Sequence, residues 1–138
     1  MKKKLLQGEA MSKSITCKAA VIYEMSAKRP YYETKPLKIQ DIELDPPGFD
    51  EVLVKVSAAG LCHSDLSVIN GNRPRVMPII LGHEGSGVIE GVGEGVKGLE
   101  VGDHVVFVFV PSCGSCIACK EGRPALCDPA LAAAGKGT

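Results

Sequence analysis

The sequence predicts a mainly β fold, a small irregular β barrel with short helices, and three observations lead to it. Several short segments are rich in β-branched and other apolar residues, most clearly residues 51–57. Glycine and proline, 16 and 9 residues of the chain, separate these segments at short intervals. Almost no stretch carries the periodicity of a long helix. Short strands joined by tight turns are typical of a small barrel.

Length and composition indicate one globular domain. The chain has 138 residues, of which 45% are hydrophobic, so it can bury a core. Its 16 basic residues balance its 16 acidic residues, which disfavours nucleic acid and anionic membranes as partners. No apolar run approaches the roughly 20 residues that span a bilayer. Residues 1–14 are interpreted as a loose leader, a cloning remnant or an upstream start before Met11.

The first half of the chain is expected to form three strands. Residues 17–23 predict a buried strand, and the polar, proline-ended residues 31–36 predict a connector. Residues 37–44 partly alternate apolar and polar side chains, which predicts a half-buried strand. The Asp-Pro-Pro-Gly turn at 45–48 ends it, because proline cannot donate to a strand ladder. Residues 51–57 form the clearest strand of this half.

A short helix is predicted next, capped by Ser64 or Asp65 and stopped by Asn70 and Gly71. Cys62 would then stand just before the helix N-terminus. The amide dipoles at that end favour a thiolate.

Glycines crowd residues 82–102 and lie around two further predicted strands. The Gly-Val-Gly-Glu-Gly run at 91–95 has the wrong spacing for a dinucleotide fingerprint, and Glu94 would repel a phosphate. Tight turns between strands at 86–92 and 104–110 explain these glycines better. We predict a fully buried strand for residues 104–110, because this run is almost wholly apolar.

Two residues from separate turns, Cys62 and His83, offer the thiolate and imidazole that zinc prefers. Each also has a simpler interpretation, since a lone cysteine is often a small buried apolar residue and a lone histidine is often just hydrogen-bonded. Cys17 stands apart from all other cysteines, and we predict a core residue there.

The strongest single signal is a loop with four cysteines. Their spacing, C-x2-C-x2-C-x7-C, lets four thiolates close a tetrahedral shell around a structural zinc ion. An iron–sulfur cluster is the alternative, but its typical run ends in C-x3-C-P, whereas the last gap here is seven residues. Metal-binding cysteines without a secretory signal indicate the reducing cytoplasm. The four residues are Cys113, Cys116, Cys119 and Cys127.

Together these motifs resemble the zinc-dependent alcohol dehydrogenases of the medium-chain dehydrogenase/reductase family. The resemblance runs from about Thr16 to the end and is carried by residues 60–65, 82–88 and 101–105 and by the four-cysteine loop. It implies a GroES-like catalytic domain over residues 15–138, an irregular β barrel with a structural zinc lobe at about 111–128.

The resemblance also implies roles for single residues. Cys62 and His83 would be two of three protein ligands of a catalytic zinc, and the third, a cysteine, would lie beyond Thr138. Asp65 would hold the other ring nitrogen of His83, and Glu84 would lie behind the zinc as a further carboxylate.

A proton relay and a substrate pocket are implied as well. Ser64 would take the proton of the alcohol. His63 would touch the cofactor diphosphate and is a candidate end of the relay, because Ser67 stands where some members carry a histidine. Phe109 would line the substrate pocket, although a core position in a strand is an equally open interpretation. Arg73 falls near the pocket mouth and leaves room for a polar or anionic substrate.

The function implied is hydride transfer between a small alcohol or aldehyde and NAD or NADP, in a homo-oligomeric parent enzyme, a dimer or tetramer. We find no dinucleotide fingerprint for a Rossmann domain in these residues, so we expect the 138-residue chain alone to be inactive. The alternative is a non-enzymatic zinc-binding module that associates with other proteins.

Overall fold

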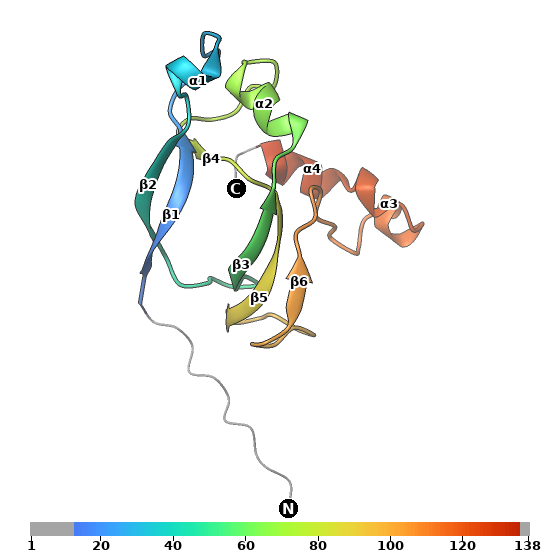
Figure 1. The fold of residues 1–138 in the computed structure, drawn as a ribbon. Helices are drawn as coiled ribbons and strands as arrows, with labels where there is room; N and C mark the ends of the chain where they lie inside the picture. Colours follow the sequence, from blue (N-terminus) through green and yellow to red (C-terminus); the bar gives the residue numbers. More distant parts are fainter. Residues whose placement is uncertain (1–12, 136–138) are drawn as a thin grey trace, which may run out of the picture. The chain divides into compact units, whose positions relative to one another are not determined.

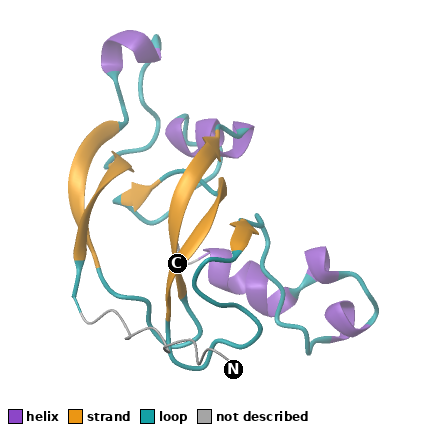
Figure 2. Cartoon of the chain, turned by 60° about the horizontal axis from the view of Figure 1, so that its bottom comes forward, coloured by secondary structure: helices purple, strands orange, loops and turns teal. Residues whose placement is uncertain are grey.

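The computed structural model describes residues 13–135, so the predicted leader lies almost entirely outside the described residues. The described chain is built mainly from strands joined by turns and short helices, which confirms the mainly β prediction (Figures 1 and 2). Among these residues the strands form two three-stranded sheets, β2-β1-β4 and β3-β5-β6, and no single closed ring. The strands are β1 (Ile15–Ile22), β2 (Lys38–Leu44), β3 (Val52–Gly60), β4 (Ile79–Ile80), β5 (Glu84–Val92) and β6 (His104–Val106).

All helices of the described chain are short. They are α1 (Tyr31–Thr34), α2 (His63–Ile69), α3 (Ile117–Lys120), the 3-10 turn η1 (Pro124–Leu126) and α4 (Asp128–Gly135). Within residues 13–135, no helix has the length and apolar character needed to cross a membrane.

The described chain divides into two compact units, and the first comprises residues 13–17, 41–59 and 85–106. Here β5 pairs antiparallel with β6, and Ser86 lies opposite Val106. Ile89 on β5 is fully buried. Gly93 directly follows β5, and its amide donates to the Glu51 carbonyl at 2.8 Å. A Cβ atom at Gly93 would lie only 1.8 Å from the Gly48 carbonyl oxygen, so close packing against backbone requires glycine there.

The second unit comprises residues 18–40, 60–84 and 107–135 and contains Cys62, His83 and the four cysteines of the loop. β1 pairs antiparallel with β4, with Val21 opposite Ile80. The buried side chains of this unit include Ile22, and Val68 and Ile69 of α2. Val68 of α2 lines the same pocket as Ile79 and Ile80 of β4, next to the two turns that carry Cys62 and His83.

Three local predictions were wrong. Residues 31–36 are not a plain connector, because α1 makes one helical turn that ends at Lys35 in the left-handed region (φ 44°). Helix α2 begins at His63 with Cys62 as its N-cap, so Ser64 and Asp65 both lie inside the helix. Cys17 is half-exposed, not a core residue.

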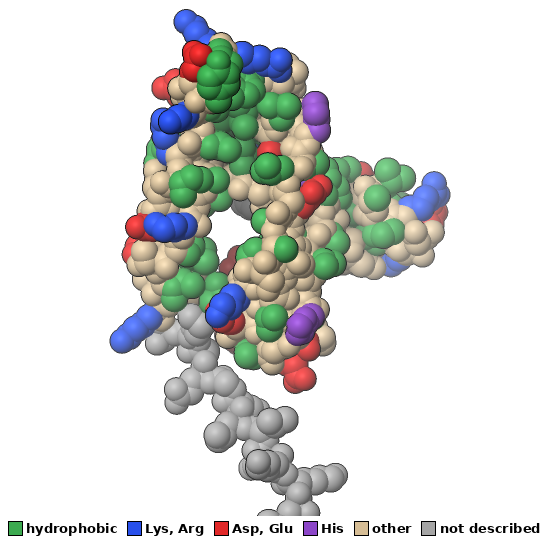
Figure 3. Space-filling model, viewed as in Figure 1, with side chains coloured by type: hydrophobic (Ala, Val, Ile, Leu, Met, Phe, Trp, Pro, Cys, Tyr) green, Lys and Arg blue, Asp and Glu red, His purple; other side chains and the backbone are tan. Residues whose placement is uncertain are grey.

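The predicted buried strand at 104–110 was also wrong. β6 has only three residues and pairs on one side, as the edge of its sheet, so its residues alternate between half-buried and exposed. Val106 is 73% exposed, and the apolar residues after it leave the sheet. Many large apolar side chains lie on the surface, and the face in Figure 3 shows them spread among charged groups.

Candidate metal centres and their pocket

Cys62 is fixed at the start of α2 by its neighbours. Its backbone is extended (φ −102°, ψ 150°), and its amide donates to Asp65 Oδ2 at 3.1 Å. The Asp65 amide donates in return to the Cys62 carbonyl at 3.1 Å. This reciprocal pair orients the Cys62 side chain relative to the helix N-terminus, where a thiolate is stabilised.

His83 follows β4 and is held by the same aspartate. The Leu81 amide donates to the Ala20 carbonyl at 3.1 Å, and Gly82 takes a positive φ of 118°, so the chain turns directly before His83. His83 Nδ1 donates to Asp65 Oδ1 at 3.1 Å. Asp65 is the one charged residue buried within the described chain. Because Asp65 accepts the hydrogen bond from Nδ1–H, the Nε2 atom of His83 keeps a lone pair for a metal.

Glu84 completes a cluster with Cys62 and His83. The potential ligand atoms of the three side chains lie within 4.8 Å of one another. Zinc bonds of about 2.0–2.3 Å to nitrogen, oxygen and sulfur place tetrahedral ligands roughly 3.3–3.8 Å apart, so small shifts of these side chains suffice. The donor set fits zinc. Gly60 makes room for it, because a Cβ atom there would lie 2.6 Å from Glu84 Oε2.

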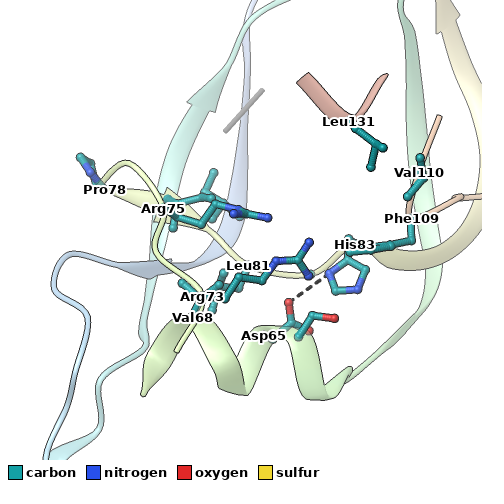
Figure 4. A pocket seen from close by; sticks show the side chains of 14 residues that line it. Asp65, Val68, Arg73, Arg75, Pro78, Leu81, His83, Phe109, Val110 and Leu131 are labelled. Carbon is teal, nitrogen blue, oxygen red and sulfur yellow. Dashed lines mark hydrogen bonds and ion pairs between the residues drawn. The ribbon is translucent and has the colours of Figure 1, made fainter. Parts of the chain in front are cut away.

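A pocket of about 690 Å³ adjoins this cluster, and His83 belongs to both (Figure 4). The Phe109 ring lies 4.7 Å from the His83 ring, between centroids, at a tilt of 54°. The guanidinium of Arg73 stacks on the Phe109 ring, with Cζ of Arg73 4.9 Å from the ring centroid. Most other side chains of the wall are apolar: Val68, Pro78, Ile79, Ile80, Leu81, Val110 and Leu131.

The predicted relay residues divide between this pocket and its outside. Ser64 lines the pocket, and its Oγ lies 3.2 Å from Cys62 Sγ. His63 does not line it, and its Nδ1 lies 3.4 Å from Ser67 Oγ. The structure thus places Ser64, Asp65, His83 and Phe109 in the wall of one pocket. His63 lies outside this wall.

The four cysteines of the loop converge in space. Their Sγ atoms all lie within 4.8 Å of one another, and about 3.8 Å is the separation in a tetrahedral zinc–thiolate site. Cys116 caps α3, Cys119 lies inside it, and Cys127 is fully buried after η1. Backbone amides point at sulfur, since the Cys116 amide donates to Cys113 Sγ and the Cys113 amide to Cys127 Sγ, both at 3.3 Å. The site therefore fits a closed, structural zinc ion.

Two of these thiols differ in acidity in the metal-free chain. Hydrogen bonds from the Ser115 side chain and amide, and then from the Cys116 amide, lower the pKa of Cys113 to about 6. Desolvation, followed by a hydrogen bond with Cys116, raises the pKa of Cys119 to about 11. At neutral pH Cys113 is therefore largely thiolate, and Cys119 stays protonated.

Comparison with known proteins decides the family. The family model described as "Alcohol dehydrogenase GroES-like domain" matches residues 48–138. The chain belongs to this alcohol dehydrogenase family. The resemblance inferred from the sequence is confirmed, together with a GroES-like domain.

Curated relatives of this alcohol dehydrogenase domain are named as dehydrogenases too. S-(hydroxymethyl)glutathione dehydrogenase of Candida maltosa is 44% identical over 92% of this chain and 32% of its own length. Putative alcohol dehydrogenase D of Mycobacterium tuberculosis is 52% identical over 80% of this chain and 28% of its own. The chain thus spans about a third of the length of the relatives it matches.

Solved structures show the same fold. Benzyl alcohol dehydrogenase of Acinetobacter calcoaceticus superposes with a TM-score of 0.72 and 38% identity, over 90% of this chain and 32% of that one. An alcohol dehydrogenase zinc-binding domain protein of Burkholderia ambifaria gives a TM-score of 0.75 and 41% identity, over 87% and 30%.

Sequence reasoning missed part of the pocket wall. Arg75 and Leu131 line it beside His83. A signal for Arg75 existed, because it lies two residues from Arg73 in the same proline-bounded loop. No sequence signal marked Leu131, because only the folded chain brings α4 to the same pocket as residues 81–83.

Proposed function

We propose that this chain is the catalytic domain of a zinc-dependent alcohol dehydrogenase, which transfers a hydride between an alcohol or aldehyde and NAD or NADP. One observation carries the proposal: the cluster of Cys62, His83 and Glu84 adjoins a largely apolar pocket through His83. A purely structural zinc needs no pocket, whereas a catalytic site keeps one position open for substrate.

Each residue of the cluster has a role in this proposal. Cys62 and His83 hold the catalytic zinc, and Glu84 offers a carboxylate at the same place. When bound, zinc lowers the pKa of a hydroxyl group that approaches it. Asp65 fixes the His83 tautomer through the 3.1 Å bond to Nδ1 and makes the opposite ring nitrogen a better ligand. Phe109 packs against the His83 ring and shapes the substrate space.

Proton transfer is assigned to Ser64 and, beyond it, to His63. The Ser64 hydroxyl lines the pocket and can accept a proton from a substrate hydroxyl. The His63 imidazole is hydrogen-bonded to Ser67, which supports it as the outer end of the path and as a contact for the cofactor diphosphate. The four-cysteine loop holds a second zinc and stabilises its lobe.

We also propose that the protein is a homo-oligomer in the cytoplasm, as the family resemblance implies. All six cysteines are free thiols, which supports a reducing compartment. A non-enzymatic zinc module explains the four-cysteine site equally well but leaves the second cluster and its pocket without a use.

The test is turnover by the native protein that carries this chain. With zinc bound, it should reduce NAD or NADP in the presence of a primary alcohol, followed by absorbance of the reduced nicotinamide. His83→Ala should lower kcat/KM by at least about a hundredfold, because the metal supplies several kcal/mol. His104→Ala, the same change at an exposed histidine of β6 outside both clusters, should leave it unchanged. No reduction of either cofactor across a broad panel of alcohols would refute the proposal.

A further inference from the structure

Two arginines stand in the pocket wall on the loop between α2 and β4. Arg73 and Arg75 are both half-buried, and Figure 4 shows the Arg73 guanidinium beside the His83 ring and the Arg75 side chain extending into the pocket. Arg73 stacks on Phe109, which fixes its position. The Arg75 Nη1 atom donates to the Pro74 carbonyl at 3.0 Å, and this bond leaves its other N–H donors for a ligand.

Neither arginine is paired with a carboxylate of the pocket. Asp65 is the one acidic side chain among the lining residues, and its two oxygens accept from the Cys62 amide and from His83 and not from an arginine. Within residues 13–135, neither Arg73 nor Arg75 forms an ion pair. Half-buried guanidinium groups without a counter-charge are costly, so an anion entering the pocket is favoured.

The rest of the wall defines what else the ligand must offer. Apolar side chains from α2, β4 and α4 surround the arginines, among them Val68, Ile79 and Leu131. A free inorganic anion would leave this apolar surface without a partner. A ligand with an apolar body and one anionic end satisfies both parts of the wall.

We propose that the substrate is an alcohol or aldehyde that bears a carboxylate at its far end. This inference rests on the proposed function, because the reacting hydroxyl is placed at the cluster of Cys62 and His83. The carboxylate is held by Arg75, whose planar guanidinium can donate two parallel hydrogen bonds to it. Arg73, anchored on Phe109, adds a second positive charge and positions the aromatic wall.

The experiment measures binding and therefore needs no turnover. Calorimetry compares 4-(hydroxymethyl)benzoate with 4-methylbenzyl alcohol, its uncharged counterpart, on the zinc-loaded 138-residue chain. We expect the carboxylate to bind at least about tenfold more tightly, because hydrogen bonds to a charged partner are the stronger ones. Arg75→Gln should abolish this preference without weakening the neutral alcohol. Arg29→Gln, the same change at an exposed arginine outside the pocket, should retain it.

The outcomes separate this inference from the proposed function. Equal binding of the two probes, or an undiminished preference in Arg75→Gln, would overturn the carboxylate subsite. Displacement of the benzoate by inorganic phosphate at equal concentration would also overturn it, because the site would then suit a phosphate of the cofactor. Turnover of neutral alcohols by the native protein, without any preference for the charged alcohol, would contradict the carboxylate subsite but not the proposed dehydrogenase activity.

Discussion

Removal of the metal from the four-cysteine loop is expected to unfold residues 113–127. This segment consists of one-turn helices and loops around sulfur, and apart from Cys127 its side chains are half-buried or exposed. The segment therefore has no apolar core of its own to stabilise it, so we expect its fold to depend on the metal. Zinc binding at such sites contributes on the order of 10 kcal/mol of folding free energy.

The measurement combines elemental analysis with hydrogen exchange. We expect about two zinc ions per wild-type chain, one at each cluster, and about one in Cys127→Ser. In that variant the amides of the loop should lose protection, while β3 and β5 keep theirs. Cys17→Ser is the matched control and should change neither quantity. Iron in place of zinc, with a coloured protein, would revive the iron–sulfur alternative; no metal at all would contradict the four-thiolate site.

Asp65→Asn is expected to weaken zinc at the Cys62 and His83 cluster by about 10- to 100-fold. The substitution keeps the size of the side chain but removes the negative charge that orients and polarises His83. It also weakens the acceptor for the Cys62 amide, which costs α2 roughly 1 kcal/mol at its N-terminus. Both effects act on the same metal site, because one buried carboxylate serves both ligands.

Competition with a chromophoric chelator measures this change. Two classes of zinc should be resolved, and only the weaker one should shift in Asp65→Asn. Asp103→Asn gives the matched control, because that carboxylate accepts the Glu100 amide in an exposed turn outside both clusters. If both zinc classes weakened together, the substitution would have damaged the fold. An unchanged weaker class would show that Asp65 does not position His83.

The two candidate metal clusters were predictable because the residue types and their spacing indicate the chemistry. The four cysteines fall within one short loop, so little tertiary information was needed to expect their convergence. Asp65 and His83 are separated by 18 residues, and the resemblance to a known family supplied their pairing. Leu131 was out of reach, because its place in the pocket depends on how α4 folds back.

Strand burial was the harder part of the fold to predict. An apolar run such as residues 104–110 reports hydrophobicity but not how many neighbours a strand has. In the structure β6 is an edge strand, so most of these side chains keep contact with solvent. Cys17 failed for a different reason, because β1 is the central strand of its sheet but is buried only at its end, at Val21 and Ile22.

The short span of the four-cysteine loop has a consequence for the order of folding. All of its ligands lie within residues 113–127, so closing this loop costs little chain entropy. Cys62 and His83, in contrast, meet only after α2 and β4 have formed. During synthesis, the first zinc ion can therefore be captured locally as soon as Cys127 leaves the ribosome. The second must wait for tertiary structure, so we expect a chain folded at limiting zinc to fill the four-cysteine site first and the Cys62 and His83 cluster last.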